Sequence, residues 1–284
     1  MRSVRPIPVV TSPTSRELFN LALEMKEAQD SAQQLDPFTA RLPWFDLPAA
    51  YKVADFVHCA RLKEGAKPIG RKIGFSNRDM WSKYGVHTPI WARIYNTTVA
   101  FLTDTRTTCP LGRFTEPKIE PEIVIQFHST PRAGAGIVEV VKSIGWIAHG
   151  FEIVQSHFPD WKFEAPDAVA DLALHGRLLI GPPQPLPQFG GDLVTALESF
   201  TLTLSCNGQP METGRGSNVL GNPLGAVADL LSVLAMQSHC DYLQAGEIVT
   251  TGTITTAHSV RAGEIWQSEL HGIGLPGLIV EFSV

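Results

Sequence analysis

The stretch Pro117-Lys118-Ile119-Glu120-Pro121-Glu122-Ile123-Val124-Ile125-Gln126-Phe127 carries two glutamates, two positions apart, in a run of apolar residues. On a β-strand, residues two apart point to the same face, so Glu120 and Glu122 project side by side. Ile119 and Ile123 point to the opposite face, where they can enter a core. The stretch therefore predicts a strand with one acidic face and one buried face.

A second strand-like run decides what the acidic face is for. A glutamate pair alone is most often a solvated sheet face. The run His149-Gly150-Phe151-Glu152-Ile153-Val154-Gln155, however, places one acid among apolar residues, and a charge is seldom left there unless it is paired or coordinates a metal. Carboxylate oxygens suit hard ions such as Mg²⁺ or Mn²⁺. We therefore predict a metal site formed by Glu120, Glu122 and Glu152.

The rest of the chain predicts a β-rich α+β fold. Helical spacing indicates helices from Ser15 to Met25 and from Pro48 to Glu64, the first capped by Ser15, with a loop over 31–43 between them. From Ile69 onward, strand-like runs alternate with Gly and Pro turns, and 224–235 is the one clear helix of the second half. The expected division is a small helical N-terminal subdomain over 1–68 and a β-rich catalytic domain over 69–284. Strands are expected at 119–127, 147–154, 200–206, 248–254 and 278–282.

Composition excludes several classes of protein. The 284 residues are 44% hydrophobic and 18% charged, with a net charge of −5, so the basic excess typical of nucleic-acid binding is missing. No apolar run approaches the roughly 20 residues that span a bilayer, and the N-terminus lacks the apolar core of a signal peptide. The scattered cysteines contain no CxxC pair, which fits a reducing cytoplasm. We expect a cytoplasmic protein that binds neither nucleic acid nor membrane.

One lysine and three histidines are candidate catalytic groups. Lys72, in the Gly-bounded stretch 70–76, can bind a substrate carboxylate, or act as an acid if burial lowers its pKa. His149, His157 and His175 surround the second acidic strand, and a histidine near the metal can be a general base for water. We take Lys72, His149 and His157 as the catalytic candidates.

A series of motifs, in order from about residue 47 to the end, resembles the fumarylacetoacetate hydrolase superfamily. The similarity is greatest to its branch of 2-oxopent-4-enoate hydratases and 4-oxalocrotonate decarboxylases, with related maleylpyruvate hydrolases. The motifs are Gly70-Arg71-Lys72-Ile73-Gly74-Phe75, Tyr84-Gly85-Val86-His87-Thr88-Pro89-Ile90, Pro117-Lys118-Ile119-Glu120-Pro121-Glu122-Ile123, Phe151-Glu152-Ile153-Val154, Asp160-Trp161-Lys162-Phe163, Val169-Ala170-Asp171, Val219-Leu220-Gly221-Asn222-Pro223-Leu224 and Leu243-Gln244-Ala245-Gly246-Glu247-Ile248-Val249-Thr250-Thr251-Gly252.

The resemblance implies a mixed-sheet β-rich roll and a Mg²⁺ or Mn²⁺ ion held by the three acids that match Glu120, Glu122 and Glu152. It implies that the 2-oxo acid end of a small substrate chelates this ion and that the protein forms homodimers or larger assemblies. Lys72 matches the active-site lysine of the family. The predicted substrate-binding residues, all within these motifs or beside them, are Lys162, Asp171, Thr251 and Thr253.

The chain also departs from the hydratase pattern. Ile90 stands where hydratases of this branch carry an aspartate, which is more similar to the decarboxylases, and Asp171-Leu172 stands where they show Asp-Asn. The His-x-x-Glu pair of many hydrolases in the superfamily is not evident. We predict an enzyme of aromatic-compound catabolism that forms an enolate. The preferred reaction is C–C hydrolysis of a maleylpyruvate- or acylpyruvate-type substrate with release of pyruvate, and the alternatives are hydration of a 2-oxopent-4-enoate-type substrate and 4-oxalocrotonate-type decarboxylation.

Two other classes of function remain to be weighed. The stretch 214–221 is rich in glycine, but it is not a GxGxxG motif and it follows a hairpin, which disfavours a dinucleotide site. A non-catalytic binding protein with the same fold would be favoured by loss of a metal carboxylate, and all three carboxylates are present.

Overall fold

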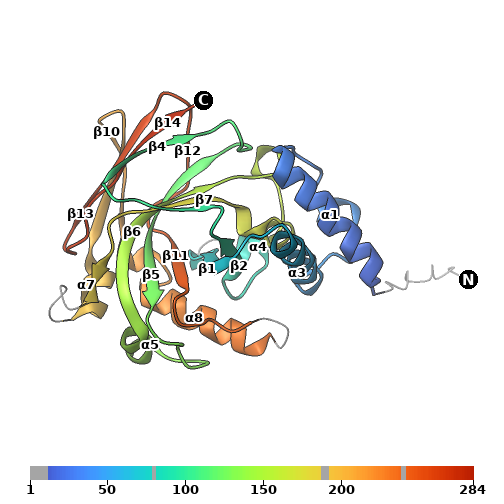
Figure 1. Cartoon of the computed structure of the whole chain (residues 1–284), viewed down its shortest axis with the longest axis horizontal. Coiled ribbons are helices and arrows are strands. Elements are labelled where there is room, and N and C mark those ends of the chain that lie inside the picture. The colour runs from blue at the N-terminus through green and yellow to red at the C-terminus, as the bar shows by residue number, and fades with distance from the viewer. Residues whose placement is uncertain (1–11, 79–80, 187–191, 238–240) are drawn as a thin grey trace, which may run out of the picture.

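A computed structural model describes residues 12–78, 81–186, 192–237 and 241–284, and two mixed β-sheets with surrounding helices make up the fold (Figure 1). The predicted α+β class is therefore confirmed. The helices are α1 (Ser15–Ser31), α2 (Phe38–Arg41), α3 (Leu47–Lys63), α4 (Trp81–Tyr84), α5 (Ile137–Ser143), α6 (Ala165–Ala170), α7 (Leu193–Ser199) and α8 (Pro223–Met236), with 3₁₀ turns η2 (Pro159–Trp161), η3 (Leu172–Leu174) and η5 (Gly216–Asn218). The strands are β1 (Pro68–Gly74), β2 (Ile90–Tyr95), β3 (Val99–Phe101), β4 (Arg106–Pro110), β5 (Lys118–Phe127), β6 (Ile144–Val154), β7 (His175–Ile180), β8 (Gln184–Pro185), β9 (Thr201–Cys206), β10 (Gln209–Arg215), β11 (Ile248–Thr253), β12 (His258–Ser259), β13 (Ile265–His271) and β14 (Ile279–Ser283).

The larger sheet carries the predicted acidic strands at its centre. Its strand order is β2-β1-β11-β5-β6-β7-β3, with β12 pairing with β5 and β8 with β6. The smaller sheet has the order β10-β9-β13-β14-β4. Strands β5 and β6 are antiparallel, and their register places Glu120 directly opposite Glu152. The fold therefore brings together two acids that are 32 positions apart in the chain.

A hydrophobic core fills the space between the two sheets. Ile123 and Phe151 enter it from β5 and β6, and Leu204 and Trp266 enter it from the smaller sheet, all nearly or fully buried. Helix α8 closes one end with Leu230 and its neighbours, beside α5 (Figure 1). This core fixes which face of β5 and β6 is free for chemistry.

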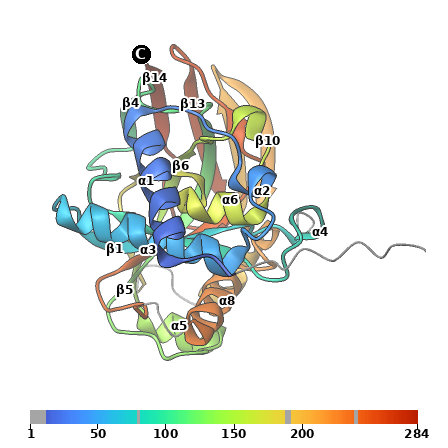
Figure 2. The ribbon, with the colours of Figure 1, turned by 90° about the vertical axis from the view of Figure 1, so that its right-hand side faces the viewer.

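The N-terminal helices pack against the larger sheet through a second core cluster. Helix α1 begins after Thr14, whose side chain and that of Glu17 form a reciprocal capping box, so the cap lies one residue before the predicted Ser15. Helices α1 and α3 share their cluster with residues of α6 and η3, and Figure 2 shows α1, α3 and α6 side by side. The division into 1–68 and 69–284 stays a prediction.

The sequence missed several short helices. Phe38 is fully buried within α2, where a loop was expected. Helices α5, α6 and α7 add to the one helix expected in the second half. They have four to seven residues, too short for a clear helical period.

One helical stretch, Gly216–Met236, is long and apolar enough by length and composition to cross a membrane, contrary to the expectation from the sequence. More than half of the most apolar part of this stretch is buried, because residues such as Leu224, Leu230 and Leu231 pack into the core. Its apolar character therefore has an explanation in the fold.

The cysteines fit the predicted scattered thiols where they are described. Cys59, Cys109 and Cys206 are free, and Cys240 lies outside the described residues. The predicted homo-oligomeric assembly stays a prediction.

Candidate metal centre and active site

The carboxylates of Glu120, Glu122 and Glu152 converge on one face of the larger sheet. Each offers one oxygen, and these three oxygens lie within 4.8 Å of one another. Glu120 and Glu122 share a face because they are two positions apart on β5, and the strand register brings Glu152 beside them. Glu122 and Glu152 are fully buried, and Glu120 is partly buried.

A glycine on β11 fixes the position of Glu122. The backbone N–H of Gly252 donates to Glu122 Oε2 at 2.8 Å. Gly252 has a φ of +106°, and a Cβ built on it would lie 2.0 Å from Ser76 Oγ. Both the backbone conformation and the lack of space require glycine here, so the close approach of β11 to Ser76, two residues after the end of β1, depends on this residue.

Glu152 is held by two basic groups. Lys72 Nζ lies 3.0 Å from Glu152 Oε1, and His175 Nδ1 lies 2.7 Å from the same oxygen. His175 is in turn hydrogen-bonded through Nε2 to Thr98 Oγ1 at 2.8 Å. Burial alone would raise the pKa of Glu152, but the charge of Lys72 and the hydrogen bond from His175 lower it to about 2. Glu152 is therefore ionised at neutral pH.

The other two carboxyl groups have the opposite shift. Burial, together with repulsion from Glu152, raises the pKa of Glu120 to about 7. Burial and repulsion from Glu152 and Glu120 also raise the pKa of Glu122. Three carboxylates this close cannot all ionise at low cost without a compensating cation.

The site fits a divalent cation. Glu122 Oε1 and Glu152 Oε2 are buried, and neither has a hydrogen-bond partner among the described residues. Buried polar atoms without partners are rare and point to an ion or water. A hard dication suits a set of three carboxylates, and it would remove their mutual repulsion. Glu120, Glu122 and Glu152 are thus the residues that could hold the predicted metal.

Lys72 does not behave as the predicted low-pKa acid. Burial lowers its pKa, but Glu152, Glu120 and Glu122 outweigh burial, so the net shift is upward. Lys72 is 97% buried and carries its charge inside the site. This environment fits a fixed cation rather than a proton donor.

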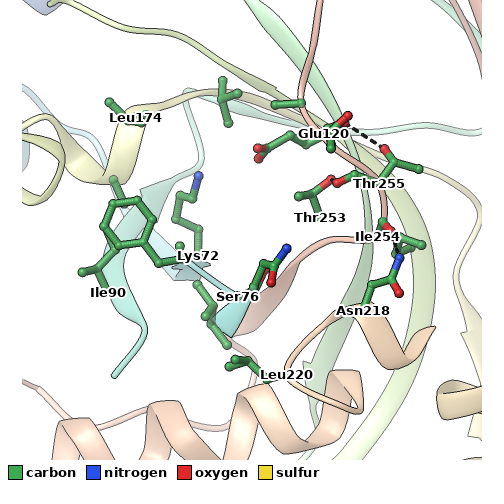
Figure 3. A pocket seen from close by; sticks show the side chains of 18 of the residues that line it. Lys72, Ser76, Ile90, Glu120, Leu174, Asn218, Leu220, Thr253, Ile254 and Thr255 are labelled. Carbon is green, nitrogen blue, oxygen red and sulfur yellow. Dashed lines mark hydrogen bonds between the residues drawn. The ribbon is translucent and has the colours of Figure 1, made fainter. Parts of the chain in front are cut away.

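A cavity of about 700 Å³ opens onto this cluster. Lys72 and Glu120 line it, with Ile90 and Leu174 on the side of Lys72 and Thr253 on the side of Glu120 (Figure 3). Its other lining groups include the aromatic residues Phe75, Phe163 and Trp161 and the charged residues Arg78, Lys118 and Glu212. The cavity is large enough for a small organic acid and combines a charged end with an apolar wall.

Only one of the predicted substrate-binding residues lines this cavity. Thr253 does so, whereas Thr251 is fully buried and donates from Oγ1 to the carbonyl oxygen of Ile123. The side chain of Lys162 is 79% exposed and pairs with Asp160, outside the cavity lining. Asp171 is buried and accepts hydrogen bonds from His157. These placements argue against direct substrate contact by Thr251, Lys162 and Asp171.

The two predicted catalytic histidines also lie away from the carboxylates. His149 stands on the core face of β6, where Nδ1 donates to the carbonyl oxygen of Glu122 and Nε2 is 2.7 Å from Ser268 Oγ. Burial lowers the pKa of His149 to about 4. His157 is fully buried against Asp171 and does not line the cavity. Neither placement fits a general base for water at the metal, so both assignments need correction.

Several lining groups had no signal in the sequence analysis. Asn218 lines the cavity and donates to the carbonyl oxygen of Ile254, and Ala173 and Leu174 come from the turn η3. Asn218 lies in the glycine-rich stretch 214–221, where the spacing of the glycines drew attention to a phosphate loop instead. The available indication of a site was its position four residues before Asn222, the N-cap of α8.

Comparison with known proteins places the chain in a family. The fumarylacetoacetate (FAA) hydrolase C-terminal family matches residues 78–276. The chain belongs to the fumarylacetoacetate hydrolase family. The resemblance drawn from the sequence motifs is thereby confirmed.

Relatives within this family are similar over almost the whole chain. A 2-hydroxyhexa-2,4-dienoate hydratase of Comamonas testosteroni is 31% identical over 87% of this chain and 91% of its own length. A 2-keto-4-pentenoate hydratase of Paraburkholderia xenovorans is 27% identical over 93% and 94%. The structure of 4-oxalocrotonate decarboxylase from Pseudomonas putida G7, complexed with magnesium and adipate, aligns with a TM-score of 0.86 at 25% identity, covering 95% of this chain and 99% of that chain.

These names bear on the predicted reaction. The relatives that are about 25% identical or more are hydratases and decarboxylases, so they support the two alternatives better than the preferred C–C hydrolase. The missing His-x-x-Glu pair is consistent with this result. Ile90 in place of the hydratase aspartate is a departure that argues against a hydratase but does not by itself favour hydrolysis.

Proposed function

We propose that the chain is a divalent-metal-dependent lyase that acts on a small unsaturated 2-oxo acid. Glu120, Glu122 and Glu152 would hold Mg²⁺ or Mn²⁺, supported by their convergence and by the two buried oxygens without partners. The similar 4-oxalocrotonate decarboxylase structures contain magnesium or calcium, which supports the same cation class. When bound, the cation supplies a Lewis acid that stabilises negative charge on the oxygens of the 2-oxo acid.

Within this class, decarboxylation of a 4-oxalocrotonate-type dicarboxylate fits the cavity best. The observation that carries this choice is Ile90, which is 97% buried and lines the cavity where hydratases of the branch carry an aspartate. Adding water to a double bond needs a group that positions and deprotonates water. Among the described lining residues the acids are Glu120 and Glu212, and no histidine or aspartate lines the cavity.

Decarboxylation needs less from the protein. The bond between the distal carboxylate and its carbon breaks, CO₂ leaves, and the electron pair moves through the conjugated chain to the 2-oxo group, where a proton is later taken up. Lys72, a buried cation 3.0 Å from Glu152, stabilises the charge that develops at this end. Ile90 and Leu174 form an apolar part of the cavity wall and keep water away from it. A carboxylate beside such a wall is poorly solvated, so the loss of CO₂, which removes its charge, is favoured.

Hydration is the second candidate, and the hydratases among the relatives support it. The 31% identical relative is a hydratase of a dienoate. In that reaction Glu212, which accepts hydrogen bonds from Thr256 and His258, is the acid among the described lining residues that lies outside the metal cluster. Burial raises the pKa of Glu212, but the hydrogen bonds from Thr256 and His258 outweigh it and lower the pKa below its usual value, which makes Glu212 a weak base.

Product analysis separates the reactions. The Mg²⁺- or Mn²⁺-loaded protein is incubated separately with 4-oxalocrotonate, 2-oxopent-4-enoate and maleylpyruvate. We expect CO₂ from the first substrate and no turnover of the others. A hydroxylated 2-oxo acid from the second substrate would establish the hydratase instead, and pyruvate from the third would restore the hydrolase. Activity that survives EDTA on every substrate would exclude the metal-dependent proposal.

A variant at Ile90 sharpens this test. Ile90→Asp introduces the acid that hydratases carry, so we expect CO₂ release to fall and hydration of 2-oxopent-4-enoate to increase. Ile90→Val keeps the wall apolar and is the matched control, with the product unchanged. An unchanged product ratio in Ile90→Asp, with the protein folded, would remove Ile90 as the basis for the choice.

A further inference from the structure

The turn η3 that forms part of the cavity wall is strained. Leu172, Ala173 and Leu174 are consecutive residues with φ values of 49°, 52° and 65°. Residues with a Cβ are disfavoured in this left-handed region, and three in a row persist only where the surroundings impose them. Ala173 and Leu174 line the cavity together with Lys72 and Glu120. The strain is therefore located at the candidate active site.

A buried acid anchors this turn. The carbonyl oxygen of Asp171 accepts from the Leu174 N–H at 2.8 Å, which closes the turn. The Asp171 carboxylate, 2% exposed, accepts from His157 Nδ1 at 2.8 Å and from the His157 backbone N–H at 3.3 Å. It also accepts from Gln29 Nε2 of α1 at 3.2 Å. A carboxylate that accepts several hydrogen bonds in a buried site is held in one position.

The anchor involves parts of the chain outside the catalytic sheet. Gln29 lies outside the stretch that matches the family, residues 78–276, and its side-chain oxygen is fixed by Arg61 of α3. The Gln155 N–H donates to the Leu174 carbonyl oxygen at 2.9 Å, which ties the turn to the end of β6. The N-terminal helices thus contact the wall of the cavity through Asp171.

We propose that Asp171, with His157 and Gln29, is a positioning group that holds the strained turn Leu172–Leu174 as the wall that selects the distal part of a 2-oxo acid. The predicted substrate-binding role of Asp171 is thereby replaced by an indirect one. The inference rests on the proposed function for the nature of the ligand. The metal centre binds the 2-oxo acid end, and the wall contacts what lies beyond it.

The wall determines the length and shape of ligand that fits. A ligand with only the chelating end, such as oxalate, reaches the metal centre without touching the turn. A six-carbon 2-oxo diacid, such as 2-oxoadipate, extends into the cavity toward Leu174. Loosening the turn therefore weakens binding of 2-oxoadipate and leaves binding of oxalate unchanged.

Ala173→Gly tests the wall directly. Glycine adopts the left-handed region freely, so the variant keeps its melting temperature while the turn becomes mobile. Calorimetric titration of the Mg²⁺-loaded protein is expected to show about tenfold weaker binding of 2-oxoadipate, as for a lost close contact in a pocket, with oxalate binding unchanged. The matched control is Ala170→Gly in α6, which is buried but outside the cavity lining. It lowers the melting temperature because glycine weakens a helix, and ligand discrimination stays the same.

Asp171→Asn tests the anchor. An amide presents NH₂ toward donors, so the hydrogen bonds from His157 and Gln29 are not all retained, and we expect the same selective loss for 2-oxoadipate. Asp167→Asn is the control, because Asp167 is an equally buried acid whose side chain bonds to Thr39 and not to the turn. If Asp171→Asn does not fold, Gln29→Ala removes one of the hydrogen bonds to Asp171, together with the one from Arg61, and is expected to give a smaller loss of the same kind.

These outcomes separate the wall from the reaction. Equal affinities of wild type and Ala173→Gly for 2-oxoadipate, or equal losses for oxalate and 2-oxoadipate, would overturn the positioning role. Failure to release CO₂ from 4-oxalocrotonate would overturn the decarboxylase proposal alone, because the titrations do not involve turnover. If oxalate does not bind to the Mg²⁺-loaded wild type, the metal centre itself is overturned, and with it both the wall proposal and the decarboxylase proposal.

Discussion

The strand pair β5–β6 presents two faces that differ completely in chemistry. One face carries Glu120, Glu122 and Glu152 beside Lys72. The other carries residues such as Ile123 and Phe151, which are buried between the two sheets. Because side chains alternate along a strand, a shift of one position separates a candidate metal ligand from a core residue.

Histidines show how strictly this alternation acts. His149 is three positions from Glu152 and therefore lies on the core face, bonded to Ser268 of the smaller sheet. His175, at the start of β7, lies on the acidic face and bonds to Glu152. His149 was chosen because it is close to Glu152 in the sequence. Two residues of one strand that are an odd number of positions apart lie on opposite faces, so this closeness was misleading.

Removing an acid from the active face is expected to have the largest effect. Glu152→Ala deletes one of the three proposed ligands and the ion-pair partner of Lys72. We therefore expect Mn²⁺ affinity to fall more than about 100-fold, beyond the range typical of outer-sphere changes, and turnover to be lost. Binding is measured by electron paramagnetic resonance. Glu281→Ala, an exposed glutamate of β14, is the control and should bind Mn²⁺ as the wild type does. Retained affinity in Glu152→Ala would contradict the ligand assignment.

Removing the cation of the same face separates chemistry from metal binding. Lys72→Met should lower kcat by roughly 10²–10³, as expected for loss of one preorganised charge, while Mn²⁺ binds at least as tightly because a competing positive charge is gone. Lys72→Arg keeps the positive charge but replaces the compact ammonium group with a larger planar guanidinium. Its kcat should therefore lie between those of Lys72→Met and the wild type. If Lys72→Met lost Mn²⁺ affinity and kcat in parallel, a role for Lys72 in the reaction itself would lose its support.

A paired substitution of the two histidines compares the faces directly. His175→Gln should weaken Mn²⁺ binding roughly 10–100-fold, because the His175 side chain orients the Glu152 carboxylate. His149→Gln should leave Mn²⁺ affinity unchanged and lower the melting temperature by a few degrees, because its two buried hydrogen bonds contribute about 1–3 kcal/mol. The reverse pattern would mean that His149 serves the metal after all.

The sequence predicted the acidic face better than its surroundings. Glu120, Glu122 and Glu152 could be found because alternation is local and because a charge in an apolar run is conspicuous. The turn Leu172–Leu174 could not, since nothing in three apolar residues predicts left-handed backbone; the contacts of Asp171 impose it. The buried positions of His157 and Thr251 depend on packing between distant segments, which spacing along the chain does not reveal.

The smallest expected effect concerns the metal-free acidic face. The pKa of Glu120 is raised from its ordinary value of 4.5 to about 7, so its neutral form favours the folded chain at low pH. This contribution is lost as pH rises from 4.5 through 7, on the order of 1–3 kcal/mol. The EDTA-treated wild type should therefore have a lower melting temperature at pH 8 than at pH 5.5, measured by circular dichroism.

Glu120→Gln removes this titration and should lessen that difference by a few degrees, with the remainder due to Glu122, whose pKa is also raised. Mg²⁺ should restore stability at pH 8 in the wild type and have little effect on Glu120→Gln, because the ion replaces the protons that the carboxylates lose. The core face carries His149, whose pKa of about 4 keeps it neutral across this range, so His149→Gln should retain the full difference between pH 5.5 and pH 8. An equal loss of the difference in both variants would show that the pH effect does not arise from the acidic face.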